Sequence, residues 1–269
     1  MILTILFSAL AIVGVMHIAF LVGTATKNNG VVDSFYGLAY VAGVWTSFLV
    51  MGTYSIFQIL VTVFVTLWGF RLAIHVTNRN WGKPEDKRYQ NMRERFGDKV
   101  LLKSYLRIYM FQSLIVFLVS FPAIFINANE SPALGLNWST FALIIGGLIW
   151  CIGFYFEAAG DYQLAHFLKQ PENKGEVMDK GLWRYTQHPN YFGEVTMWWG
   201  IWIIATGFNF PWGIITIFGP IIITYMIINV SGVKLLNKRF EGDDKYADYK
   251  RRTSQFFPMP PKEQKKNNQ

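Results

Sequence analysis

Cysteine is almost absent from this chain of 269 residues, because Cys151 is the only one. A single cysteine excludes an intrachain disulfide. Cys151 also falls inside a long apolar run, so we interpret it as a packing residue.

The glycine-rich loops that cradle phosphates are absent as well. The chain has neither a Walker loop nor a Gly-x-Gly-x-x-Gly fingerprint. No internal repeat and no metal-ligating cluster is visible, so we expect no metal site. A dinucleotide, if the chain uses one, must therefore be held by side chains from several helix ends rather than by a Rossmann turn.

Charged residues are scarce, at 16%, whereas 52% of the residues are hydrophobic and 17% are aromatic. Apolar runs of about 17 to 25 residues are long enough to cross a bilayer as helices. We therefore predict an all-α, polytopic integral membrane protein with about seven transmembrane helices. The expected spans are residues 2–22, 32–50, 53–76, 105–127, 139–159, 192–208 and 211–230.

The charge that is present is mostly basic, with a net charge of +8. Lys and Arg number eight in residues 77–104, four in 160–191 and ten in 231–269, but none occurs in 128–138. Basic connections stay in the cytoplasm, which predicts an outside N-terminus and a cytoplasmic C-terminus. Because this charge adjoins the spans, it favours lipid headgroups or a phosphorylated cofactor over nucleic acid.

We expect one transmembrane domain over residues 1–258, with cytoplasmic loops covering the site, followed by a disordered cytoplasmic tail at 259–269. The first run lacks a basic start and a small-residue cleavage site. We therefore interpret it as a retained helix and not a signal peptide.

Residues 181–194, the signature segment, gather Arg, Gln, His, Asn, Tyr and Glu in front of an apolar run. Pro189 disfavours helical angles at His188, which predicts a helix start near Asn190. Asn190 and Glu194 then lie one turn apart on one face. A basic interfacial loop leading into a span would also account for these residues.

The pattern Leu-Trp-Arg-Tyr-x-x-His-Pro-Asn-Tyr-x-Gly-Glu at 182–194 resembles the signature of the steroid 5α-reductase-like membrane proteins. The tail at 246–258, Tyr-x-x-Tyr-x-x-x-Thr-Ser-x-x-x-Pro, is similar to the ending of their bacterial members. A looser likeness extends to sterol C14 and C7 reductases. A weaker one extends to isoprenylcysteine and phospholipid methyltransferases, which use a different cofactor.

The resemblance implies NADPH as the cofactor and places part of its site in the signature segment and beside Asp161. From the residues themselves, Arg71, His75, Asn78 and Arg79 form one polar face at the end of the third helix, suited to a phosphate or to snorkelling into headgroups. The expected cofactor residues are Arg71, His75, Asn78, Arg79, Glu157, Asp161, Tyr162, Trp183, Arg184, Tyr185, His188, Asn190, Tyr191, Asn237, Arg251 and Arg252.

For the catalytic residues, the resemblance implies an acidic residue that helps to polarise a 3-oxo group, and Asp33 occupies a comparable place in this chain. The family's tyrosine donor is replaced here by Trp68, whose indole cannot serve as a proton donor. Tyr36 and Tyr54 are therefore candidate substitutes. Glu194 is the fifth candidate, since it follows Asn190 by one turn.

The expected activity is that of a 3-oxo-5α-steroid 4-dehydrogenase, the NADPH-dependent reduction of the C4–C5 double bond of a 3-oxo-Δ4 steroid. An S-adenosylmethionine-dependent methyltransferase and a catalytically silent sterol-binding protein are the alternatives. The expected partners are a hydrophobic enone substrate and membrane lipid, without nucleic acid or an obligate protein partner. We expect the protein in a bacterial inner membrane.

Overall fold

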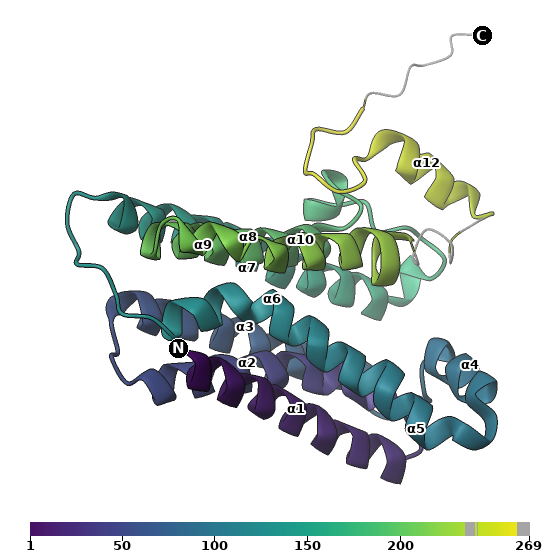
Figure 1. Ribbon diagram of the computed structural model, residues 1–269. Helices are drawn as coiled ribbons and strands as arrows, with labels where there is room; N and C mark the ends of the chain where they lie inside the picture. Colours follow the sequence, from purple (N-terminus) through teal and green to yellow (C-terminus); the bar gives the residue numbers. More distant parts are fainter. Residues whose placement is uncertain (235–239, 241, 263–269) are drawn as a thin grey trace. The chain divides into compact units, whose positions relative to one another are not determined.

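The computed structural model describes residues 1–234, 240 and 242–262, and every regular element in these ranges is helical (Figure 1). The predicted all-α class is confirmed. The first part of the chain forms α1 (Ile2–Ala25), α2 (Val31–Met51), α3 (Ile56–Asn80), α4 (Lys87–Phe96), η1 (Gly97–Lys99), α5 (Val100–Ser104), η2 (Tyr105–Met110) and α6 (Phe111–Asn127). The second part forms α7 (Trp138–Lys169), η3 (Pro171–Asn173), η4 (Gly181–Arg184), α8 (Pro189–Phe208), α9 (Trp212–Ile215), α10 (Phe218–Tyr225), η5 (Met226–Ser231) and α12 (Asp244–Arg252).

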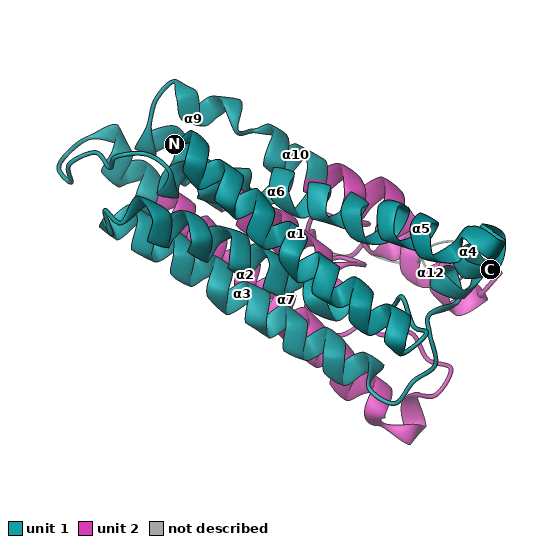
Figure 2. Ribbon diagram, turned by 60° about the horizontal axis from the view of Figure 1, so that its bottom comes forward, with its two compact units in different colours: residues 1–144, 201–222 teal, residues 145–200, 223–269 magenta. Residues whose placement is uncertain are grey.

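The helices form two compact units (Figure 2). Unit 1 comprises Met1–Ile144 and Ile201–Ile222, and unit 2 comprises Ile145–Gly200 and Ile223–Gln269. The single domain predicted over residues 1–258 stays a prediction.

In unit 1, helices α1, α2, α3 and α6 pack side by side. Helices α2 and α3 approach closely at Gly37 and Gly69, because a Cβ on Gly37 would overlap the Gly69 carbonyl. Small residues permit such close contact between membrane helices. The fully buried Asn127 of α6 donates its amide to the Val44 carbonyl and to Thr62 Oγ1, each at 3.1 Å. This amide ties α2, α3 and α6 together within the core of unit 1.

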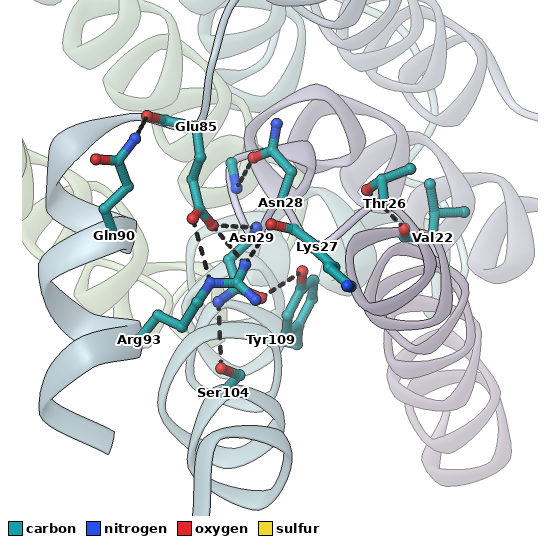
Figure 3. Close-up of polar contacts among 11 residues, drawn as sticks. Val22, Thr26, Lys27, Asn28, Asn29, Glu85, Gln90, Arg93, Ser104 and Tyr109 are labelled. Atoms are coloured by element: carbon teal, nitrogen blue, oxygen red, sulfur yellow. Dashed lines mark hydrogen bonds and ion pairs between the residues drawn. The ribbon is translucent and has the colours of Figure 1, made fainter. Parts of the chain in front are cut away.

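A polar cluster joins the loop between α1 and α2 to α4 and η2 (Figure 3). The Asn29 backbone N–H donates to Glu85 Oε1 at 2.5 Å, and the Tyr109 hydroxyl donates to Asn29 Oδ1 at 3.3 Å. Arg93 donates to Glu85 Oε1 at 2.9 Å and to the Lys27 carbonyl at 2.7 Å. Side chains therefore satisfy loop backbone groups that no helix pairs.

In unit 2, glycines bring α7 and α8 into close contact. A Cβ on Gly193 would overlap the backbone nitrogen of Glu157. A Cβ on Gly160 would press on Pro189 and would lie 3.2 Å from the backbone nitrogen of Asn190. The polar residues of α7 and of the signature segment are thereby held close to one another.

Within the described residues, six helical stretches are long and apolar enough to cross a membrane. They are Ile2–Ala25, Val31–Met51, Ile56–Asn80, Lys87–Asn127, Trp138–Lys169 and Trp212–Val230. These stretches support an integral membrane protein. The seventh predicted span, residues 192–208, is helical as part of α8 but is not among the six, because polar residues, glycines and tryptophans interrupt its aliphatic character.

The number of crossings can be measured from the two ends of the chain. Seven crossings, with α8 included, place the N-terminus outside and the C-terminus in the cytoplasm, as the basic connections require. We expect a reporter that is active only in the cytoplasm to be active at the C-terminus and inactive at the N-terminus. Activity at both ends would show that α8 does not cross, and an inactive C-terminal fusion would contradict the orientation.

Candidate functional site

The signature segment consists of η4, a buried stretch and the start of α8. Thr186, Gln187 and His188 are at most 3% exposed. Helix α8 begins at Pro189, a position where the missing backbone N–H costs no hydrogen bond. The predicted helix start is confirmed, and Asn190 and Glu194 lie one turn apart on α8.

Asn190 and Asp161 form a hydrogen-bonded pair between α8 and α7. The Asn190 amide donates to Asp161 Oδ1 at 2.9 Å, while its own Oδ1 accepts from the Tyr191 backbone N–H at 3.0 Å. Asp161 is only 8% exposed. A carboxylate so withdrawn from water needs polar partners, and the amide supplies one. The structure thus brings together two residues that the sequence assigned to one site.

Trp183 anchors the segment to both of its neighbours. Its indole N–H donates to the Gly160 carbonyl of α7 at 3.0 Å, and its carbonyl accepts from the Tyr249 hydroxyl of α12 at 2.6 Å. Burial raises the pKa of Tyr249, so its hydroxyl keeps the proton that it donates. Trp183 thus has a structural role in addition to the predicted cofactor contact.

The tail residues after α12 accept hydrogen bonds from the signature segment through their backbone. Gln187 donates its side-chain amide to the Thr253 carbonyl at 2.7 Å and its backbone N–H to the Ser254 carbonyl at 2.9 Å. Thr186 Oγ1 donates to the Phe256 carbonyl at 2.8 Å. The sequence predicted neither partner of Gln187, because every residue has a carbonyl and no residue type marks an acceptor.

The tail stays hydrogen-bonded beyond the boundary predicted at residue 258. The Met259 backbone N–H donates to the Tyr185 carbonyl, and the Lys262 backbone N–H donates to the Arg252 carbonyl, each at 2.9 Å. These bonds extend the ordered chain over residues 259–262, whereas 263–269 lie outside the described residues.

Arg251 and Arg252 are both paired with acids. Arg252 donates to Asp179 Oδ2 at 2.7 Å and lies 3.4 Å from Asp248 Oδ2. Arg251 donates to Asp248 Oδ1 at 3.0 Å. Asp179 precedes the signature segment, so Arg252 ties α12 to the approach of that segment.

His188 is a buried side chain without a hydrogen bond. It is 1% exposed, and neither ring nitrogen has a hydrogen-bond partner among the residues that the structure describes. Its ring stacks on Tyr191, with 5.3 Å between centroids. Burial, followed by the nearby charge of Lys250, lowers the pKa of His188 to about 4. The imidazole is therefore neutral at pH 7 and offers one donor and one acceptor.

Two further acids lie on the same helices. Glu157 precedes Asp161 by one turn on α7 and is 3% exposed, and its backbone lies against Gly193. Glu194, on α8, is partly buried. Unit 2 therefore contains Glu157, Asp161, Asn190 and Glu194 on two helices that glycines hold in close contact.

Other predicted cofactor residues of unit 2 are exposed or lie outside the described part. Tyr162 is 72% exposed and stacks on His166, and Arg184 and Tyr185 are exposed. Asn237 lies outside the described residues.

In unit 1, Asp33 has a partner that sequence reasoning missed. The Tyr89 hydroxyl of α4 donates to Asp33 Oδ1 at 2.7 Å, and Arg88 lies 3.7 Å from Asp33 Oδ2. Tyr89 is 7% exposed although it lies in a highly charged segment. The sequence shows only an aromatic residue among charged ones, and nothing in its spacing points to Asp33.

The other unit 1 candidates divide into three places. The Tyr36 hydroxyl lies 2.9 Å from that of Tyr40, which packs edge-on against Trp68. Tyr54 is 49% exposed and follows α2, whereas Asp33 lies in its first turn, about 30 Å away along the helix axis. The structure therefore does not bring Tyr54 to Asp33. At the end of α3, Arg71 and His75 are partly buried and Asn78 and Arg79 are exposed.

Unit 2 fits a polar ligand better than a metal ion. No group of three or more His, Cys, Asp or Glu side chains in the described residues could hold a metal. In contrast, the buried His188 nitrogens and Gln187 Oε1 lack hydrogen-bond partners there. Buried polar atoms without partners are costly, and a ligand that carries both donors and acceptors would satisfy them.

Acid is expected to destabilise the protein through His188. Its pKa is 6.5 when unfolded and about 4 when folded, so the folded state binds fewer protons between these values. Stability is therefore lost as the pH falls through this range, by about 2 kcal/mol between pH 7 and pH 5. Thermal unfolding in detergent should show a weaker pH dependence in His188→Asn. The same substitution at the exposed His166 serves as the control and should leave it unchanged, and an unaltered His188→Asn profile would refute the assignment.

The comparisons with known proteins concern most of the chain. Residues 19–253 match the family described as "Protein of unknown function (DUF1295)", a range that includes the signature segment and α12. No curated protein and no solved structure matches the chain. Because the match covers far more than half of its length, the chain belongs to the DUF1295 family.

Proposed function

We propose that this protein is an NADPH-dependent reductase of an enone in a flat lipid, of the 3-oxo-Δ4 steroid class, and that unit 2 holds the cofactor. The observation that carries the proposal is the hydrogen bond from the partly buried Asn190 to the buried Asp161, with the unpartnered ring of His188 close by in the sequence. The resemblance of residues 182–194 to steroid 5α-reductase-like proteins supports the same assignment.

The side chains of unit 2 suit a bound nucleotide. Asn190 and the neutral His188 offer both donors and acceptors, as the amide and hydroxyl groups of a dinucleotide require. His188 is buried, so water does not compete for its hydrogen bonds. When bound, NADPH supplies the hydride that adds to the β-carbon of the enone.

Glu194 is the unit 2 candidate for the substrate oxygen. Hydride addition places negative charge on the 3-oxo oxygen, and protonation of the α-carbon then completes the reduction. A hydrogen-bond donor aimed at this oxygen in a dry site lowers the barrier. Glu194 follows Asn190 by one turn and is partly buried, so a protonated carboxyl there would supply such a donor.

The cofactor assignment is tested by equilibrium binding to the detergent-purified protein. We expect NADPH to bind and S-adenosylmethionine not to bind. Asn190→Ala and Asp161→Ala should abolish NADPH binding in a protein that still folds, because each removes one partner of the hydrogen bond between α7 and α8. Asn173→Ala is the matched control, since Asn173 is also partly buried in unit 2 but its side chain bonds only to the nearby Phe167 and Gln170. Binding of S-adenosylmethionine instead of NADPH would replace the proposal by a methyltransferase.

The role of Glu194 is tested by single-turnover oxidation of NADPH with a 3-oxo-Δ4 steroid. Glu194→Ala should slow the reaction on the order of 10² to 10³-fold, the usual cost of losing one stabilising donor. Glu194→Gln keeps the shape and a donor, so it should retain more activity than the alanine variant. The exposed Glu172→Gln should behave as wild type. A wild-type rate in Glu194→Ala would leave Glu194 with a structural role only.

A further inference from the structure

A cavity of about 470 Å³ lies in unit 2, beside the last turn of α12. Its wall consists of that turn, the chain that follows it and Gln187 of the signature segment. This volume falls within the range of about 300 to 1,000 Å³ that is typical of small-molecule sites.

The lining of this cavity is strongly basic. Lys250, Arg251, Arg252 and Lys262 contribute to it, and no carboxylate does. Asp248 and Asp179 hold the two arginines. Lys250 and Lys262, in contrast, have no acid within ion-pair distance in the described part of the chain. Two lysines without counterions beside two oriented guanidinium groups form a site for a multiply charged anion.

Gln187 adds a requirement that a bare anion does not meet. It is 3% exposed and lines the cavity, and its Oε1 has no hydrogen-bond partner in the described residues. The amide orientation is fixed, because Nε2 donates to the Thr253 carbonyl at 2.7 Å and a flipped amide would set two oxygens against each other. The buried Oε1 therefore needs a donor such as a hydroxyl group.

A ligand for this cavity must carry a phosphate next to a hydroxyl group, and a phosphorylated ribose does. We propose that the cavity binds the 2′-phosphorylated ribose of the adenosine half of NADPH, and that it makes the protein prefer NADPH over NADH. The lysines and arginines hold the 2′-phosphate, while Gln187 Oε1 accepts from a ribose hydroxyl. This inference rests on the proposed function and adds the group that selects between the two nicotinamide cofactors.

The test uses two nucleotides that differ only in the 2′-phosphate. Adenosine 2′,5′-bisphosphate and adenosine 5′-monophosphate are titrated calorimetrically into the full-length, detergent-purified protein. Wild type should bind the bisphosphate at least about tenfold more tightly, the effect of gaining a charge-assisted hydrogen bond. The double variant Lys250→Gln, Lys262→Gln should lose this preference while its affinity for the monophosphate is unchanged.

The matched control is Lys169→Gln, Lys174→Gln, which makes the same change in net charge at two exposed lysines of unit 2. It should keep the preference of the wild type, so that a general electrostatic effect is separated from contact in the cavity. Equal affinities of the wild type for the two nucleotides, or no binding of the bisphosphate, would overturn the inference.

Two further outcomes identify what fails. If NADPH and NADH bind with equal affinity in wild type and in the double variant, the inference is overturned and the reductase proposal stands. If neither dinucleotide binds, the proposed function fails. The retention of phosphatidylglycerol, measured by mass spectrometry, tests a lipid occupant. If retention falls in the double variant while nucleotide affinity does not depend on the 2′-phosphate, the cavity binds an anionic lipid headgroup and the inference is overturned.

Discussion

Side chains of the signature segment hold the end of the chain through its backbone carbonyls. Thr186 donates to the Phe256 carbonyl and Gln187 to the Thr253 carbonyl. In return, the Tyr249 hydroxyl donates to the Trp183 carbonyl. These groups are buried, so each is costly if left unpaired, at about 1 to 3 kcal/mol. The segment and the tail therefore stabilise one another, and neither is expected to hold its conformation alone.

Neighbouring residues of the signature segment have different roles. Trp183, Thr186 and the amide nitrogens of Gln187 serve the fold, because their partners are backbone groups of the same unit. His188 and Gln187 Oε1 have no partner in the described residues. Polar groups left over in a segment whose other groups are satisfied are the ones available to a ligand. The fold thus separates supporting residues from candidate binding residues within one short stretch of sequence.

The fold could be predicted from the sequence further than the site could. Long apolar runs predicted seven spans, six of which the described residues support, and Pro189 predicted the start of α8, because helix length and proline act locally. The pairing of Asp33 with Tyr89 joins residues that are 56 positions apart, and no periodicity reports such a contact. The resemblance placed Asp161 and Asn190 in one site, but the hydrogen bond between their side chains was not predicted. Tyr54 was a candidate for its residue type alone, and the length of α2 separates it from Asp33.

The hydrogen bonds between the signature segment and the tail also set the order in which the protein can be completed. The donors on Thr186 and Gln187 are synthesised 66 to 70 residues before their acceptors. At about 5 to 20 residues per second, the ribosome leaves these donors without partners for several seconds. During that interval the first helices can already be inserted, while the segment stays open to water and to chaperones. A chain that ends early would therefore carry its first membrane helices but a signature segment without its partners, which proteases can recognise.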